Sequence, residues 1–233
     1  RRGEEVFYAA LPFFHAFGLT FNLFCAVQKA ATQLIFPKFS VSGVLEQHRR
    51  RPVTFFVGVP VMFERILAGA QKAGVSLRSL RYGVCGAAPM PPEVGAAWEE
   101  ATGGFFVEGY GMTETSPIVS GTPMGPSRRM GALGLPFAST DVRVVHPDHP
   151  DPEREVPDGE PGLLSTRGPY TFRGYYRSPE HNAQVFDAEG FYFSGDVVQR
   201  DAAGYLKVVG RVKDQINRGG EKVSPLEVDA VLM

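Results

Sequence analysis

Short hydrophobic runs alternate with longer amphipathic stretches over the first 110 residues of the chain. The runs predict strands over residues 6–11, 32–36, 53–57, 80–85 and 105–109, and the stretches between them predict helices over 14–30, 41–51, 60–73 and 91–101. Gly74 and Gly103 follow two of these helices, where a chain often turns through a left-handed residue. Strands that alternate with helices predict a parallel sheet with helices on both faces.

The pattern changes past about residue 130. Short strands are expected over 141–145, 162–168, 190–200 and 204–211, with turns such as PDGEPG and DAAG between them. This texture is typical of an antiparallel, barrel-like β-subdomain. The predicted fold class is therefore α/β, a parallel sheet flanked by helices plus the barrel-like antiparallel subdomain. Near the end, Ser224, Pro225 and Glu227 have the spacing of a capping box that starts a helix.

Residues 6–27 carry no charge and are long enough to span a bilayer. Pro12, His15 and Asn22 interrupt this segment, and a strand, a proline break and a buried helix account for it as well. We expect that second arrangement and no membrane span. Glu4 and Glu5 stand where a signal peptide would carry positive charge.

The composition indicates an ordinary globular protein. The 24 basic and 25 acidic residues are balanced, so the chain lacks the excess of positive charge that favours nucleic-acid binding. The two cysteines, Cys25 and Cys85, are isolated in apolar segments, which suits buried thiols in a reducing compartment and predicts a cytoplasmic protein. With 27 glycines and 19 prolines, the chain should hold many turns and close backbone approaches.

The stretch EGYGMTE, which follows the predicted strand 105–109, has the chemistry of a nucleotide site. Tyr110 between Gly109 and Gly111 offers a flat face for a base, Thr113 can donate to a phosphate, and Glu114 can bind magnesium. Gly86-Ala87-Ala88-Pro89 follows another strand, and ligands of parallel sheets bind beyond the carboxyl ends of the strands. The alternative is an ordinary turn between a strand and a helix.

Two charged residues in the second half could complete such a site. Asp196 in FSGD could accept two hydrogen bonds from a ribose diol, and Arg211 in GRVKD could meet the ribose or a phosphate. A turn aspartate and a solvated arginine are the alternatives. His146 and His149 could share a metal, but a proline-rich surface turn is favoured for HPDHP. The sequence contains no GxxxxGK[ST], GxGxxG, GxSxG or CxxC motif.

As a set and in this order, several stretches resemble the acyl-adenylate-forming (AMP-binding) superfamily. They are LPFFHAFG, GAAPMPPE, EGYGMTETSP, TRGPYTFRGYY, FYFSGDVV and GRVKDQINRGGEKVSPLEVD. Residues 1–150 look like fatty acyl-CoA ligases, and residues 163–230 look like siderophore aryl-acid AMP ligases. The resemblance implies a fragment of the large domain: residues 1–129 as its truncated α/β subdomain, 130–214 as its β-subdomain, and 215–233 as the hinge exit and the start of a truncated C-terminal domain.

The resemblance implies a role at each matching position. Tyr110 would stack on adenine, with Gly111 beside it and Gly86, Ala87 and Ala88 on the other side of the base. Thr113 would contact the α-phosphate, and Glu114 would bind Mg²⁺. Asp196 would hold the ribose hydroxyls, with Arg211 next to it.

The remaining roles concern the acid and the thiol. His15 would gate the carboxylate pocket, and His15, Thr113 and Glu114 form the implied catalytic set. The acyl pocket would be lined by Val57, Gly58, Val59 and Gly109. Asp214 matches a hinge, and Gly219 and Gly220 would flank a tunnel for the pantetheine arm.

The implied reaction is ATP-dependent activation of a carboxylic acid to an acyl-AMP, followed by transfer to a thiol. The cofactors would be ATP and Mg²⁺, and the acceptor would be CoA or the phosphopantetheine of an acyl or aryl carrier protein. Ala16 stands where catechol-reading ligases have asparagine, so a fatty or simple aromatic acid is favoured. The phosphate loop with its lysine and the C-terminal lysine are absent from the 233 residues, so we expect this chain alone to be weakly active or inactive. The alternative is a non-catalytic nucleotide- or acyl-binding module.

Overall fold

The computed structural model describes residues 2–125, 127–147, 154–214, 216–218 and 221–223, together with Pro225 and Val228. The chain divides into two compact units, Arg1–Gly131 and Ala132–Met233. Each unit is described by itself.

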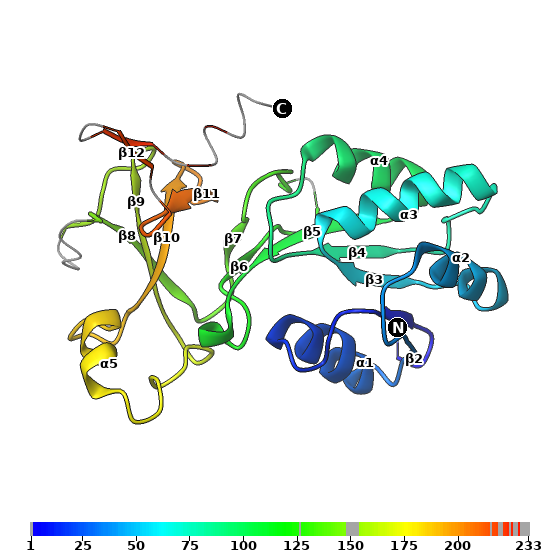
Figure 1. The fold of residues 1–233 in the computed structure, drawn as a ribbon, viewed down its shortest axis with the longest axis horizontal. Helices are drawn as coiled ribbons and strands as arrows, with labels where there is room; N and C mark the ends of the chain where they lie inside the picture. Colours follow the sequence, from blue (N-terminus) through cyan, green and yellow to red (C-terminus); the bar gives the residue numbers. More distant parts are fainter. Residues whose placement is uncertain are drawn as a thin grey trace. The chain divides into compact units, whose positions relative to one another are not determined.

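The first unit is built on a mostly parallel sheet (Figure 1). Five strands pair side by side in parallel: β2 (Thr32–Ile35), β1 (Val6–Ala9), β3 (Phe55–Gly58), β4 (Tyr82–Cys85) and β5 (Phe105–Tyr110). The short strand β6 (Ser120–Gly121) pairs antiparallel with β5. This order confirms the parallel sheet predicted from the alternating pattern.

Helices cover both faces of this sheet. Figure 1 shows α3 (Pro60–Ala73) and α4 (Pro92–Thr102) on one side and α1 (Cys25–Gln28) on the other, and α2 (Val41–Arg50) packs against α3. Helix α2 begins at Ser40, whose hydroxyl accepts the N–H of Gly43. Helices α3 and α4 end at Gly74 and Gly103, which have φ angles of 60° and 68°, so both expected left-handed caps are confirmed.

The segment between β1 and β2 differs from the single helix expected over 14–30. It forms a π-helix, η1 (Gly18–Phe24), followed directly by α1. Hydrophobic periodicity cannot separate a π-turn from an α-turn over seven residues, which is why the sequence missed it. Across the described part of the chain, no helix has the length and apolarity needed to cross a membrane.

Aromatic side chains fill the core between the sheet and helices α3 and α4. The Phe63 ring lies edge-on to Trp98, Phe106 and Phe56, with ring centroids 4.7, 5.2 and 4.9 Å apart. At Gly83 an added Cβ would lie 2.7 Å from the Trp98 indole nitrogen. Glycine at this position of β4 therefore makes room for the indole.

Two buried polar groups sit near the start of the strands. Glu5 accepts hydrogen bonds from Thr54 and Arg81. Burial alone would raise the pKa of Glu5, but these bonds outweigh it and the pKa is lowered. His48 accepts the N–H of Val53 at Nδ1, which places its ring proton on Nε2, 3.1 Å from the carbonyl of Ser76.

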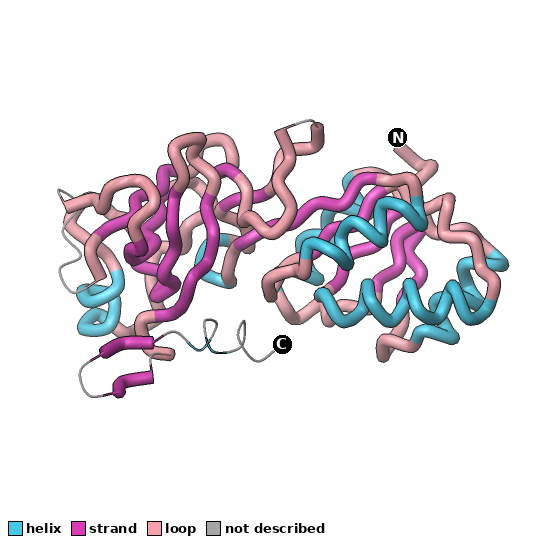
Figure 2. Tube along the Cα trace, turned by 90° about the horizontal axis from the view of Figure 1, so that it is seen from above, coloured by secondary structure: helices cyan, strands magenta, loops and turns pink. Residues whose placement is uncertain are grey.

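The second unit is mostly strand and loop (Figure 2). Its sheet has the antiparallel order β11 (Leu206–Arg211), β10 (Tyr192–Arg200), β9 (Pro161–Arg167), β8 (Asp141–Val145). The strands of the antiparallel subdomain are thus confirmed. The unit also contains elements that the sequence pattern did not predict: α5 (Pro179–Val185), β7 (Leu135–Pro136) and the hairpin of β12 (Ile216–Arg218) and β13 (Glu221–Val223).

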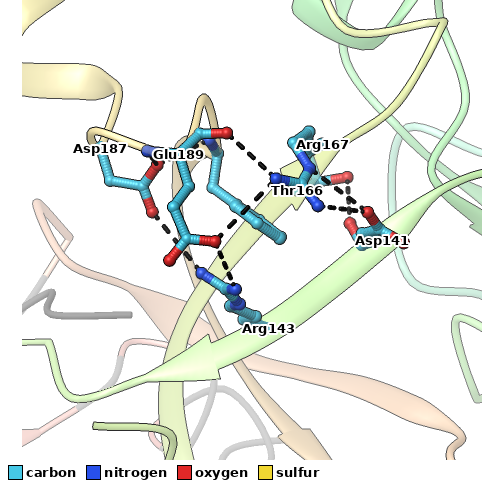
Figure 3. Close-up of polar contacts among 7 residues, drawn as sticks. Asp141, Arg143, Thr166, Arg167, Asp187 and Glu189 are labelled. Carbon is cyan, nitrogen blue, oxygen red and sulfur yellow. Dashed lines mark hydrogen bonds and ion pairs between the residues drawn. The ribbon is translucent and has the colours of Figure 1, made fainter. Parts of the chain in front are cut away.

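An ionic cluster fixes the turn before β10 to strands β8 and β9 (Figure 3). Arg143 pairs with Glu189 at 2.8 Å and Asp187 at 3.9 Å, and Arg167 pairs with Asp141 at 2.9 Å. Both guanidinium groups also lie over the ring of buried Phe191, 3.9 and 4.5 Å from its centroid. The two guanidinium groups thus cover the buried Phe191 ring.

Candidate functional site

Three glycines meet where strands β3, β4 and β5 end. The N–H of Gly86 points to the carbonyl of Gly58 at 3.4 Å. An added Cβ at Gly86 would lie 3.1 Å from the carbonyl oxygen of Gly109 and 3.2 Å from the Phe17 ring. The structure therefore brings together three segments singled out in the sequence, from Gly58, Gly86 and Gly109. They lie at the sheet edge where ligands of parallel sheets bind.

The middle of the loop after β4 is exposed. Ala87 and Ala88 are exposed, while Gly86 before them and Met90 after them are buried. Ala87 has a φ of 69°, a left-handed conformation that costs a non-glycine residue free energy. Anchored ends and a strained, exposed centre are typical of a loop that holds a ligand.

The two glycines around Tyr110 have different structural roles. A Cβ at Gly111 would lie 1.7 Å from the carbonyl oxygen of Pro117, so any side chain there collides with backbone. At Gly109 the nearest atom is 3.9 Å away, the carbonyl oxygen of Ser120. Gly111 is therefore required by the fold, whereas Gly109 leaves open space beside half-buried Tyr110.

The residues after Gly111 form a single 3₁₀ turn, η2 (Thr113–Thr115). The Thr115 hydroxyl accepts the N–H of Met112 and donates to its carbonyl, at 3.1 and 3.0 Å. This fixed turn leaves Thr113 exposed and Glu114 half-buried. Thr113 and Glu114 are three and four residues after Tyr110, the last residue of β5.

Glu114 has the chemistry of a partial magnesium site. Among the described residues, no three His, Cys, Asp or Glu side chains gather as a metal site. Mg²⁺ commonly takes only one or two carboxylates and completes its shell with water and substrate phosphates. One carboxylate beside the exposed Thr113 fits an Mg²⁺ that also takes phosphate oxygens from a nucleotide, and does not fit an ion held by protein alone.

Glu108 is a buried carboxyl that the sequence analysis did not select. Its Oε2 accepts the N–H of Gly131 at 2.8 Å, and the backbone of Met90 also hydrogen bonds to it. Burial raises its pKa to about 7, and these two bonds and the charge of Arg128 only partly offset that effect. The available signal was a carboxylate at the end of the apolar run FFVEG.

The expected acyl-pocket and gate residues come from three places: β3 with the residue after it, Gly109 of β5, and the segment before η1. Val57 and Gly58 are buried in β3, and Val59 is half-buried after it. His15 is exposed before η1, and its Nδ1 accepts the N–H of Phe17 at 3.2 Å. Since Nδ1 is then unprotonated, the ring presents an Nε2–H donor.

In the second unit, Asp196 and Arg211 are partners on adjacent strands. They are paired in the register of β10 and β11, and Arg211 Nε lies 2.7 Å from Asp196 Oδ1. The Asp196 carboxylate is buried, with 8% of its side chain exposed, while Arg211 is 65% exposed. Asp214 is exposed, and its N–H donates to the carbonyl of Arg211. Gly219, Gly220 and His149 lie outside the described residues.

Comparison with known proteins identifies the class of protein to which this fold belongs. Its features are the parallel sheet, the glycine-rich turns at the ends of its strands and the antiparallel second unit. A family model described as "AMP-binding enzyme" matches residues 1–176. The chain belongs to this family, as its resemblance to adenylate-forming enzymes had implied.

Curated relatives are acid–CoA ligases. A long-chain-fatty-acid–CoA ligase of Escherichia coli O6:H1 is 32% identical over 99% of the chain, and a feruloyl-CoA synthase of an Amycolatopsis species is 36% identical over 97%. The chain covers 40% and 45% of these two proteins. It thus spans less than half the length of the curated relatives it matches.

Solved structures of the same family share the fold. ATP-bound MatB from Rhodopseudomonas palustris has a TM-score of 0.87 with 30% identity, and the match covers 98% of this chain and 44% of the MatB chain. The anthranilate CoA ligase AuaEII in complex with anthranoyl-AMP has a TM-score of 0.84 with 31% identity, and the match covers 100% of this chain and 44% of the AuaEII chain. The match confirms both predicted parts of the fold.

Proposed function

We propose that this chain is the nucleotide-binding part of an ATP-dependent acid–thiol ligase. The observation that carries the proposal is the meeting of the Gly86 loop with Gly109 at the end of β5, where Gly109 leaves open space beside Tyr110. Homologues crystallised with ATP, with ATP and magnesium, or with an aryl-AMP support a nucleotide at this family's site. The division of the chain at residues 129 and 214 is part of the same proposal.

In the first unit, each side chain has a task that follows from its position. Tyr110 stacks on the adenine, and the Gly86–Ala88 backbone lines the other face of the base. Gly111 keeps the turn tight, and the Thr113 hydroxyl then donates a hydrogen bond to an α-phosphate oxygen. Glu114 holds the Mg²⁺ that neutralises the phosphates.

The chemistry follows from charge. An acid carboxylate oxygen attacks the α-phosphorus of ATP in line, the bond to the β-phosphate oxygen breaks, and pyrophosphate leaves. Negative charge develops on the phosphate oxygens, so fixed donors such as the Thr113 hydroxyl lower the barrier most. A thiol then attacks the acyl carbon of the anhydride, and AMP departs.

His15, the end of β3 and Gly109 of β5 receive the acid. Val57, Gly58, Val59 and Gly109 would line an apolar acyl pocket, and His15 Nε2–H would gate its mouth. In the second unit, Asp196 would accept the ribose hydroxyls, with Arg211 beside it. Asp214 would serve as a hinge, and Gly219 and Gly220 would line the thiol tunnel.

We propose a fatty or simple aromatic acid as substrate and CoA as the first acceptor to test. Support comes from the curated relatives, which include fatty acid and feruloyl CoA ligases. A carrier-protein pantetheine is the other acceptor implied by the KDQINRGGEK stretch. A panel of acids from salicylate to dodecanoate, tested for ATP–pyrophosphate exchange in an intact version of the ligase, identifies the acid. Fast exchange by the isolated chain would contradict its expected weak activity.

The decisive test separates the magnesium role from nucleotide binding. In Glu114→Gln, ATP affinity should lose its dependence on Mg²⁺, while AMP affinity should stay within about twofold of wild type, because AMP needs no bridging ion. Glu100→Gln, an exposed acid on α4, is the matched control. If Mg²⁺ strengthens ATP binding equally in wild type and Glu114→Gln, the magnesium assignment is wrong.

A further inference from the structure

The carboxyl group of Glu108 joins two segments that leave the sheet edge. Its Oε2 accepts the Gly131 N–H at 2.8 Å, and the backbone of Met90 also hydrogen bonds to the carboxyl. Met90 ends the loop that begins with Gly86, the loop proposed to line the adenine. Glu108 itself is two residues before Tyr110 in β5. One buried side chain therefore ties both backbone walls of the proposed base site together.

Further hydrogen bonds hold the backbone of Glu108 and the segment before Gly131. The Glu108 N–H donates to the Thr122 hydroxyl at 2.8 Å, and the Thr122 N–H donates to the Glu108 carbonyl at 2.9 Å. Arg128, three residues before Gly131, forms two bonds of 2.6 Å with Glu99 of α4. These bonds hold the Glu108 backbone and Arg128 in place, and the two bonds of the carboxyl fix the Met90 and Gly131 ends to β5.

We propose that Glu108 is a proton-sensitive positioning residue of the nucleotide site, which holds the Gly86–Met90 loop and the Gly131 end against β5. This inference rests on the proposed nucleotide function, because the loop matters only if it lines the base.

The charged and titratable groups around the carboxyl set the direction of its pH dependence. They are Cys85 on β4, Arg128 on the segment before Gly131, and Glu99 of α4 behind Arg128. Burial raises the pKa of Cys85, so the thiol stays neutral near pH 7. With the loop closed, the pKa of Glu108 is about 7; in water it is about 4.5. Ionised Glu108 therefore gains more by moving into water, so the closed loop binds a proton and loosens as the pH rises.

The size of the effect follows from these two values. Between pH 6 and pH 8 the opening equilibrium should rise by about tenfold in the wild type, since only the closed state still titrates in that range. Glu108→Gln has nearly the same shape and cannot ionise, so its opening should not vary with pH. Glu100→Gln, at an exposed position on α4, should follow the wild type.

The test measures hydrogen exchange and AMP binding on the full chain at pH 6 and pH 8. Exchange of peptides covering 86–91 and 128–132, corrected for the intrinsic rate, should report the tenfold rise in wild type and Glu100→Gln and none in Glu108→Gln. AMP affinity should weaken in parallel. If AMP binds and Glu108→Gln keeps the wild-type slope, the inference alone is overturned. If opening follows the pattern but AMP binds to no variant, the proposed nucleotide function fails and the positioning role fails with it.

Discussion

Asp196 and Arg211 face each other across strands β10 and β11, with Arg211 Nε 2.7 Å from Asp196 Oδ1. The same arrangement occurs on β8 and β9, where Arg167 Nη2 lies 2.9 Å from Asp141 Oδ2. The two pairs differ in burial, since 8% of the Asp196 side chain is exposed against 60% of Asp141. The proposed ribose contact requires the Asp196 carboxylate to exchange the guanidinium of Arg211, which is 65% exposed, for the ligand.

Asp196→Asn should therefore weaken AMP binding at least tenfold, because the amide has one acceptor oxygen for a diol instead of two. Asp141→Asn carries the same chemical change on the exposed pair and should leave AMP affinity unchanged. Isothermal titration of the two variants at equal ionic strength makes the comparison. Equal losses in both variants would show that a general charge effect, and not a ribose contact, is being measured.

Gly111→Ala should destabilise the first unit strongly. The new methyl group would meet the Pro117 carbonyl oxygen at 1.7 Å, and backbone on both sides must move to relieve the overlap. A loss of about 3 kcal/mol or more in the free energy of unfolding is expected. Gly43→Ala in helix α2 is the control: its nearest neighbour lies at 3.6 Å, so it should stabilise by about 0.5 kcal/mol. Urea unfolding monitored at Trp98 measures both, and equal midpoints would contradict the account.

His48 should make the first unit sensitive to acid. Burial lowers the pKa of His48 below its ordinary value of 6.5, against the hydrogen bond to Ser76. Above pH 6.5 His48 is neutral in both the folded and the unfolded chain, and its burial costs no stability through protonation. As the pH falls below 6.5, the unfolded chain takes up a proton at His48 that the folded chain resists, so the folded state loses stability. In His48→Gln this part of the pH dependence should vanish between pH 7 and pH 5. The matched control is His15→Gln, at an exposed histidine of the same unit; unchanged acid sensitivity in His48→Gln would refute the assignment.

Arg143 should matter more than Arg167 for the second unit (Figure 3). The Arg143 side chain is 22% exposed and pairs with Glu189 and Asp187, whereas Arg167 is 43% exposed. Arg143→Leu leaves two carboxylates without this partner and should cost about 1–2 kcal/mol, while Arg167→Leu should cost less than about 1 kcal/mol. Thermal unfolding at low and high salt makes the measurement. The reverse order of the two losses would contradict the burial argument.

The sequence predicted what depends on local pattern. The strands of the parallel sheet and the caps at Gly74 and Gly103 follow from alternation and from glycine conformation, and the structure has them. The π-helix over Gly18–Phe24 was missed, because its hydrophobic pattern is compatible with an α-helix. Helix α5 was missed because none of its residues is buried, so no apolar face marks it.

The candidate site was only partly visible in the sequence. Tyr110 and Glu114 were selected because their side-chain types suit a nucleotide. Glu108 was not selected, since its importance depends on Met90 and Gly131, which are 18 and 23 residues away along the chain. Contacts of this kind arise from the fold and leave no periodic signal in the sequence.

Binding of AMP to the wild-type chain and to Tyr110→Ala tests the central claim most directly. Stacking on an aromatic ring contributes about 1–3 kcal/mol per base, so Tyr110→Ala should bind AMP about 5- to 150-fold more weakly. Tyr176→Ala, at a tyrosine 84% exposed in the second unit, should bind like the wild type. Wild-type binding with this loss only in Tyr110→Ala is the predicted result. Equal affinity in all three proteins, or no binding by the wild type, would contradict a nucleotide site at the end of β5.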